Sequence, residues 1–445
     1  MQYFVSSGLL RPKKSNTQSN RLNHYLNYPL VGLASIAAEA ATGVSVIHGG
    51  YEAPDEVGAR INPQRDDSIF LSMPSVYSVP WAGAFLSSLA HRGYNGRVVC
   101  GGRWVLDNRV PWVRQKLGYA NLEFVDGFGE SYVRARFGLP AGDPDEGPGH
   151  DYTLMPDYLE YQPSVEVSRG CGRGCHFCVE RGARRETIAS GAKAARRIGE
   201  LEELYSPLTC RPFVQASLFA PSRKWVDEFG CEYGDRGVRT QWRAESRVDA
   251  MSREVIHDLA ASGLKVLDLG LESASPLSLA AMGKTRNSDR YLRRATETLE
   301  ACTDVGIQVK LNLVLYAGDT RADVRKTVAW LRERRDLFRG ISANPLIYYP
   351  KEMSSSLPLD LVGMGASLAN PSQLSESGFA DLDLSPEINN RDAVQICTEI
   401  TQEFITARDY FELKKFAYFS PRLSFESFID KVLVDDTSVL PFRVE

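Results

Sequence analysis

The sequence predicts an α/β protein with two parallel-sheet domains in series and a smaller region at the carboxyl end. The chain has 445 residues, which is more than one ordinary core accommodates. Short β-branched runs alternate with helix-forming stretches in two separate series. Residues 138–158 lie between the two series. They are rich in Pro, Gly and Asp, a composition that is typical of a linker.

The first series covers residues 26–137 and follows a polar segment, residues 1–25, that we expect to be a loose arm. Its apolar runs end in glycine or proline and are followed by helical stretches. Glycines after the carboxyl ends of buried strands are typical of a doubly wound parallel sheet, whose ligands bind at those ends. The expected helices are 30–41 and 81–91, and the expected strands are 44–48, 68–72, 96–100 and 122–126.

The second series covers residues 159–349 and contains six strand–helix units. Six units are two fewer than a full eight-stranded barrel, so we predict a partial (β/α)6 barrel. The expected strands are 164–167, 213–219, 239–243, 266–271, 309–315 and 340–348. The expected helices are 188–203, 223–229, 253–262, 289–304 and 321–335. Residues 350–445 lose the alternation and are expected to form a small C-terminal region over the barrel, with a helix at 391–408.

Composition narrows the function classes. A net charge of −4 and a pI near 6.0 argue against an extended nucleic-acid interface. No apolar run approaches the roughly 18 residues of a membrane span, and the amino terminus lacks the apolar core of a signal peptide. We therefore expect a cytoplasmic protein without membrane contacts. Cysteines stay reduced there, so a cluster of them indicates a metal or catalytic site.

Three of the eight cysteines, Cys171, Cys175 and Cys178, fall within the stretch SRGCGRGCHFCVERG at 168–182. Glycines between them free the backbone to wrap around a ligand. Structural zinc usually needs four ligands, and a ferredoxin-type cluster needs a fourth cysteine close by. A [4Fe–4S] cluster with three protein ligands instead leaves one iron open for chemistry. The remaining cysteines are read as buried apolar residues or, for Cys231, as a residue without a nearby partner.

The spacing C-x3-C-x2-C, with Phe177 before the last cysteine and a barrel strand directly before the loop, resembles the radical S-adenosylmethionine (SAM) superfamily. The resemblance implies that the open iron binds SAM. It also implies that one electron, from a flavodoxin- or ferredoxin-type donor, cleaves SAM to methionine and a 5′-deoxyadenosyl radical that attacks a small-molecule substrate. The protein's part is to orient the reacting carbon and to exclude water.

Two further segments resemble the superfamily. In WRAESRVD (242–249), Arg247 is expected to face the cofactor carboxylate; the alternative is a surface ion pair with Asp249. LGLES (269–273), followed by MGK (282–284), is expected to place Glu272 and Ser273 near the cofactor; the alternative for Glu272 is capping of the next helix, around Ser275. The metal ligands expected from the resemblance are Cys171, Cys175 and Cys178, and the cofactor-binding candidates are Phe177, Gln215, Ser217, Arg247, Glu272, Ser273 and Asn312.

Other positions are expected near the site from their place on strands alone. Gln215 and Ser217 stand where relatives often carry an acidic pair, so we expect only uncharged contacts there. The Asp319-Thr320 pair is expected to start a helix. Tyr348 and Tyr349 either floor the substrate pocket or belong to the core. Pocket acids and amides expected from strand position are Glu166, Asp268 and Asn312, and no residue can be assigned as the acid or base.

Residues 26–137 resemble the Rossmann-like, cobalamin-binding-type (B12-binding) domain that precedes many radical SAM barrels. The resemblance lies in PLVGLA (29–34), VCGG (99–102) and VDGFGE (125–130). The D-x-H-x-x-G element, which supplies a cobalt-ligating histidine in some corrinoid proteins, is absent, so bound cobalamin stays an open question.

Two enzymatic readings follow. The first is a radical transformation without cobalamin, such as dehydration of an amino sugar in natural-product biosynthesis. A radical diol dehydratase of apramycin-type aminoglycoside biosynthesis is an example of similar size, and the bulky Arg103-Trp104 pair after Gly102 favours this reading. The second is a cobalamin-dependent C-methyltransferase. A non-catalytic electron carrier or iron–sulfur sensor is the third alternative, and the wrapped three-cysteine loop argues against it.

Overall fold

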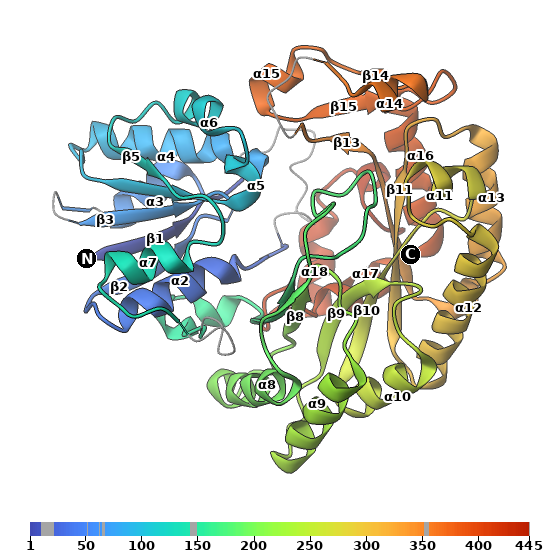
Figure 1. The fold of residues 1–445 in the computed structure, drawn as a ribbon, viewed down its shortest axis with the longest axis horizontal. Coiled ribbons are helices and arrows are strands. Elements are labelled where there is room, and N and C mark those ends of the chain that lie inside the picture. Colours follow the sequence, from blue (N-terminus) through green and yellow to red (C-terminus); the bar gives the residue numbers. More distant parts are fainter. Residues whose placement is uncertain are drawn as a thin grey trace.

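The structure is a computed structural model that describes residues 1–9, 22–50, 52–61, 63–64, 67–142, 149–350 and 356–444. Figure 1 shows two α/β units side by side and a third, smaller sheet that lies above the barrel. Among the described residues, no helix is both long and apolar enough to cross a membrane.

The first unit is a five-stranded parallel sheet with the strand order β2-β1-β3-β4-β5. One face packs on α2 and α7, and the other on α3, α4 and α6 (Figure 1). This arrangement confirms the doubly wound sheet. The strands are β1 (Gln2–Ser6), β2 (Val44–His48), β3 (Ser68–Ser72), β4 (Val98–Gly101) and β5 (Leu122–Phe124). The helices are α2 (Tyr28–Ala38), α3 (Pro54–Ile61), α4 (Val79–His91), α5 (Arg103–Leu106), α6 (Val110–Leu117) and α7 (Glu130–Arg136).

The expectation of a loose arm over residues 1–25 is wrong for its first part. Gln2–Ser6 is β1, which pairs with a parallel strand on each side. Phe4 and Val5 are fully buried, one on each face of the sheet. The amino-terminal ammonium lies 2.6 Å from the Asp67 carboxylate. A five-residue strand at the chain start has no flanking turn signals, so the polar residues after it dominate the sequence pattern. Residues 10–21 lie outside the described residues.

The second unit is a sheet in the order β12-β11-β10-β9-β8-β6-β7. Six strands are parallel and in chain order, as predicted for a partial barrel, and β7 adds a short antiparallel edge. Helices cover the outer side (Figure 1). The strands are β6 (Ser164–Arg169), β7 (Glu186–Thr187), β8 (Phe213–Ala216), β9 (Trp242–Arg247), β10 (Leu264–Glu272), β11 (Gln308–Leu315) and β12 (Gly340–Pro345). The helices are α8 (Gly191–Tyr205), α9 (Arg223–Asp235), α10 (Arg253–Ala261), α11 (Pro276–Ala281), α12 (Ser288–Asp304) and α13 (Arg321–Arg332).

The third strand of the barrel starts later than the expected 239–243. The backbone N–H groups of Arg239 and Thr240 donate to the Glu202 carboxylate and so form a loop. Trp242, the first residue of β9, is fully buried and packs against Phe229 of α9. The outward side of β9 is thereby fixed at Trp242, and the alternate residues point into the barrel.

The segment expected to be a linker is well packed at its end, because Tyr152 is buried and its hydroxyl donates to the Ser164 carbonyl. The C-terminal region forms a small sheet in the order β13-β15-β14 and a group of helices. The expected helix 391–408 is instead two helices, α16 and α17, because Ile405 is extended. The elements are β13 (Ile347–Tyr348), α14 (Leu359–Gly363), β14 (Ser367–Leu368), α15 (Gln373–Ser377), β15 (Ala380–Asp383), α16 (Asn390–Phe404), α17 (Ala407–Lys414) and α18 (Phe425–Val432).

Candidate functional site

The cysteine loop follows β6 directly and depends on its first glycine. Gly170 has φ +70°, and a Cβ there would lie 2.0 Å from the Arg184 carbonyl oxygen. Two residues later, the Gly172 N–H donates to the Ala183 carbonyl at 2.9 Å. The loop therefore folds back on residues 183–184, an approach that any side chain at position 170 would block.

The same loop is fastened to the end of α11. The His176 N–H donates to the Met282 carbonyl at 2.8 Å, and the His176 ring nitrogen Nδ1 lies 3.0 Å from the Ala281 carbonyl oxygen. Gly283, with φ +61°, leaves room for this ring, because a Cβ there would lie 2.9 Å from Nε2. The MGK segment thus positions the cysteine loop, a contact that the sequence did not indicate.

The three cysteines lie together on this loop. Cys175 is buried, whereas Cys171 and Cys178 are half-buried. Burial and the nearby Cys171 and Cys175 raise the pKa of Cys178 to about 11. Among the described residues, no three His, Cys, Asp or Glu side chains converge on one ion position. A [4Fe–4S] cluster does not require such convergence, since each cysteine binds a different iron. Three thiols on a wrapped loop therefore fit a cluster with one open iron.

Arg247 lies beside the cysteine loop. Its Nη1 is 3.6 Å from the Cys175 sulfur, and its Nη2 donates to the Lys284 carbonyl at 3.0 Å. The ion pair with Asp249, which was the alternative reading, is also present at 2.9 Å, but Arg247 is buried and the pair is not at the surface. The guanidinium is thus held at the level of the cysteines, where a cofactor carboxylate is expected.

Glu272 pairs with Lys284, whose Nζ lies 2.7 Å from Oε1. It has φ +67° at a bulge in β10, a conformation that is uncommon for a non-glycine residue and typical of functional sites. The capping alternative is wrong, because the Ser275 N–H bonds to the Ser273 hydroxyl. That hydroxyl also lies 3.1 Å from Thr327 of α13, so Ser273 is engaged outside the barrel lumen.

The remaining cofactor candidates are distributed over the carboxyl end of the barrel. The Asn312 side-chain amide lies 3.5 Å from the Glu245 carboxylate. Phe177 lies edge-on to Tyr316 and is 5.8 Å from the Lys284 ammonium. Gln215 donates to the Ser164 hydroxyl at 3.3 Å. Their roles as cofactor contacts stay predictions.

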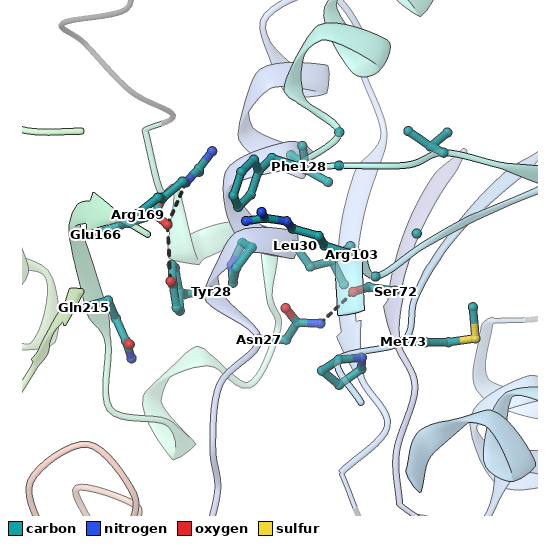
Figure 2. Close-up of a pocket in the computed structure, with 18 of the residues that line it drawn as sticks. Asn27, Tyr28, Leu30, Ser72, Met73, Arg103, Phe128, Glu166, Arg169 and Gln215 are labelled. Carbon is teal, nitrogen blue, oxygen red and sulfur yellow. Dashed lines mark hydrogen bonds and ion pairs between the residues drawn. The ribbon is translucent and has the colours of Figure 1, made fainter. Parts of the chain in front are cut away.

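A cavity of about 360 Å³ lies between the carboxyl edge of the first sheet and the barrel (Figure 2). The strand order reverses between β1 and β3, which is where such sheets bind ligands. Gln215 and Ser217, both expected at the site, line this cavity together with the end of β4. Its further lining residues include Leu30, Ser72, Met73, Gly102, Arg103, Phe128, Glu166 and Arg169.

Arg169 joins the two units across this cavity (Figure 2). Its guanidinium lies 2.6 Å from the Glu166 carboxylate and 2.7 Å from that of Glu130. Arg169 is therefore engaged by carboxylates of both units. Phe128 is stacked between two guanidinium groups, 4.7 Å from Arg103 and 4.1 Å from Arg169. Sequence patterns could not indicate this arrangement, because Phe128 and Arg169 belong to different domains.

A second cavity, of about 870 Å³, reaches the cysteine loop from the C-terminal region. Phe177 and Cys178 form one wall, and Tyr348 and Tyr349 form another; that these tyrosines floor the substrate pocket stays a prediction. Arg109 contributes a buried guanidinium. The other lining residues include Val76, Asp107, Arg181, Tyr316, Asp360 and Leu361.

The described cysteines outside the loop match their expected environments. Cys231 is exposed and the other four are buried, namely Cys100, Cys210, Cys302 and Cys397.

The Tyr25–Tyr28 segment contacts both the barrel and the C-terminal region, which the sequence did not indicate. The Tyr28 hydroxyl donates to Glu166, and Tyr25 stacks on Tyr418 of the C-terminal region.

Residues 165–331 match the family model described as the radical SAM superfamily. The ribosomal protein uS12 methylthiotransferase RimO of Methylorubrum extorquens is 28% identical over 296 residues, which are 59% of this chain and 63% of RimO. The tRNA-2-methylthio-N(6)-dimethylallyladenosine synthase of Thermobifida fusca is 25% identical over 191 residues, 39% of this chain and 37% of that enzyme. The chain thus spans less than two thirds of the length of these relatives.

Two solved structures share the fold over most of the chain. The radical SAM methyltransferase TsrM of Kitasatospora setae, in a structure with cobalamin and a [4Fe–4S] cluster, has a TM-score of 0.62 at 13% identity and covers 77% of this chain and 74% of its own. The cobalamin-dependent SAM radical enzyme OxsB has a TM-score of 0.58 at 14% identity and covers 76% of this chain and 52% of its own.

The family match covers the cysteine loop, the strands β6–β11 and both segments that hold Arg247 and Glu272. The fold of the two solved structures extends over both α/β units. Residues 165–331 therefore form a radical SAM domain, for which the superfamily implies a [4Fe–4S] cluster and SAM, and the fold of the chain is that of the two cobalamin-dependent structures.

Proposed function

We propose that the chain abstracts a hydrogen atom from a small polar molecule and converts it without cobalamin, by dehydration or a similar radical reaction. The observation that carries this proposal is that Arg103, Phe128 and Arg169 stack across the carboxyl edge of the first sheet, which is the edge where a bound cobalamin would lie. The remaining cavity of about 360 Å³ is at the lower end of the roughly 300–1,000 Å³ typical of small-molecule pockets.

The residues around the cysteine loop have distinct parts in this proposal. Cys171, Cys175 and Cys178 would hold the cluster, and Arg247 and Glu272 would orient the cofactor beside it. When bound, the cluster and SAM supply a 5′-deoxyadenosyl radical. Phe177 and Tyr316 are an apolar screen next to the loop that would keep water from the reacting carbon. Polar side chains of the barrel interior would orient the substrate.

The test is anaerobic reconstitution of the cluster, followed by SAM and a strong chemical reductant, with chromatography of the products. We expect 5′-deoxyadenosine to form. An intact cluster that gives no 5′-deoxyadenosine would favour the electron carrier or sensor reading instead. With cell extract fractions as a source of substrate, formation should rise above the rate without substrate.

A second candidate is cobalamin-dependent methylation of a carbon atom. It is favoured by the cavity at the β1/β3 switch point and by the fold likeness to TsrM and OxsB. A visible spectrum of the protein purified from cobalamin-fed cells separates the two candidates. A stoichiometric corrinoid band supports methylation, and its absence supports the reaction without cobalamin. The RimO relatives are named for a ribosomal protein, so a protein substrate is a further outcome to examine in the same assay.

A further inference from the structure

The six parallel strands of the barrel carry four carboxylates, and three of them are paired. Glu166 pairs with Arg169 at 2.6 Å and Glu272 with Lys284 at 2.7 Å, while Asp268 pairs with Arg243 and with Lys310. The fourth, Glu245, has no ion pair within the part of the chain that the structure describes. Its contact is the Asn312 side-chain amide at 3.5 Å.

Glu245 points into the barrel. On β9, Trp242 packs outward on Phe229, and Ala244 and Ser246 are buried on the same outer side. Alternate residues face the other way, and Arg243 does so by donating to the Leu413 carbonyl of α17. Glu245 is nevertheless exposed, although both of its chain neighbours are buried. An exposed side chain on the inner face of a barrel faces open space in the lumen.

The distance to the cysteine loop suits a substrate. Arg247, the next inward residue of β9, contacts the Cys175 sulfur at 3.6 Å. Two residues along a strand span about 6.6 Å, so Glu245 lies one side-chain layer below the level of the cysteines. A molecule of sugar size that contacts Glu245 therefore reaches the level of the cysteine loop.

The two cations near Glu245, Arg243 and Lys310, are both paired with the Asp268 carboxylate. Glu245 is open to the lumen but lies deep among protein atoms, and this desolvation, followed by the Asp268 carboxylate, raises its pKa, while Lys310 and Arg243 act in the opposite direction. The other titratable groups that face it are Glu272, Tyr25 of the amino-terminal segment and Tyr418 of the C-terminal region. A ligand that brings a positive charge would stabilise the ionised carboxylate.

We propose that Glu245 is a substrate-binding residue that holds an ammonium group, so that the substrate is a small amine. The inference rests on the proposed function, because the ligand meant is the substrate of the radical reaction. Asn312, beside the carboxylate, is placed to bind a neighbouring hydroxyl group. The substrate class is then an aminated, hydroxylated ring compound and not an acid.

The experiment measures binding by the cluster-reconstituted enzyme with SAM present and no reductant, by calorimetry at pH 7.5. The two probes are 2-deoxystreptamine, a cyclohexane ring with two ammonium and three hydroxyl groups, and scyllo-inositol, a neutral ring with hydroxyl groups only. We expect the wild type to bind the diamine at least about tenfold more tightly than the neutral ring. Glu245→Gln should lose this preference, and Glu300→Gln, at an exposed site on α12, should keep it.

Three results would overturn the proposal: equal affinity of the wild type for both probes, an unchanged preference in Glu245→Gln, or a loss of SAM binding in Glu245→Gln, which would assign the residue to the cofactor. Circular dichroism of the variant checks that it is folded. Because no turnover is involved, failure here is distinct from failure to form 5′-deoxyadenosine.

Discussion

At the scale of single residues, Asp319 has an unusual environment. Its carboxylate accepts hydrogen bonds from the Ser278 hydroxyl at 2.6 Å and from the Tyr316 N–H at 2.8 Å. The following residue, Thr320, caps α13 as predicted. Asp319 is 6% exposed, and burial raises its pKa to about 6. The native state therefore binds a proton at Asp319 more tightly than the unfolded chain does.

Asp319→Asn should remove the loss of stability that ionisation of Asp319 causes as pH rises. Between the unfolded pKa, about 3.9, and the folded value, ionisation of Asp319 lowers the free energy of unfolding as pH rises, and above about pH 6 the full cost, at most about 3 kcal/mol, is present. The wild type should thus lose stability relative to Asp319→Asn from pH 4.5 to pH 7. Urea titrations at several pH values measure this difference. The exposed Asp235→Asn variant is the control, and parallel pH profiles for wild type and Asp319→Asn would contradict the prediction.

The cysteine assignment makes a second prediction at this scale. Cys171→Ala, Cys175→Ala and Cys178→Ala should each lose the visible absorbance of the reconstituted cluster and the cleavage of SAM, because each removes the ligand of one iron. Cys231→Ala, at an exposed cysteine outside the loop, should retain both. Full activity in any of the three loop variants would refute the ligand assignment.

At the scale of elements, the cysteine loop is shaped by backbone contacts. Gly170 needs a positive φ and has no room for a Cβ, whereas a Cβ at Gly174 would meet no atom within 4 Å and its φ is not in the left-handed region. Gly170 and Gly174 each stand directly before a cysteine of the motif, but only Gly170 is required by the backbone, and the sequence alone does not reveal this difference.

Gly170→Ala should accordingly impair the loop, and Gly174→Ala should not. In Gly170→Ala the added methyl group must displace the backbone of residues 183–184, so we expect the iron content after reconstitution to fall at least about fivefold. Iron and sulfide analysis of both variants, with circular dichroism to check the fold, measures this effect. Equal iron content in the two variants would show that the loop adapts.

The elements also show how far sequence reasoning extends. The six barrel strands and most helices were predictable, because their apolar periodicity and N-cap residues are local signals. β1 was missed because a strand at the chain start has no flanking signal. The partners of Arg169 and Lys284 were not predictable either, since Glu130 and Glu272 are brought to them by the fold. The sequence could not single out Glu245, because its lack of an ion pair is visible only in three dimensions.

At the scale of the whole molecule, three parts of the chain meet below the barrel lumen. Arg243 of β9 is fully buried, forms an ion pair with Asp268 of β10 and donates to the carbonyls of Leu413 and Phe416. From the other side, the His24 N–H donates to the Tyr418 carbonyl at 2.7 Å. The amino-terminal segment, the barrel and the C-terminal region thus meet around the buried Arg243–Asp268 ion pair.

Asp268→Asn should weaken this junction far more than the loss of a surface ion pair weakens the protein. It leaves the Arg243 guanidinium buried without its carboxylate, which typically costs about 3–5 kcal/mol. Glu403→Gln removes the partner of Arg332, an exposed pair at 2.6 Å, and should cost less than about 1 kcal/mol. Chemical denaturation followed by circular dichroism compares the two variants at pH 7.5. Because Arg243 also binds the backbone of the C-terminal region, limited proteolysis of Asp268→Asn should cut that region first. Similar midpoints for Asp268→Asn and Glu403→Gln would mean that the helices after α16 are held by their aromatic core alone and not by the charge beneath the barrel.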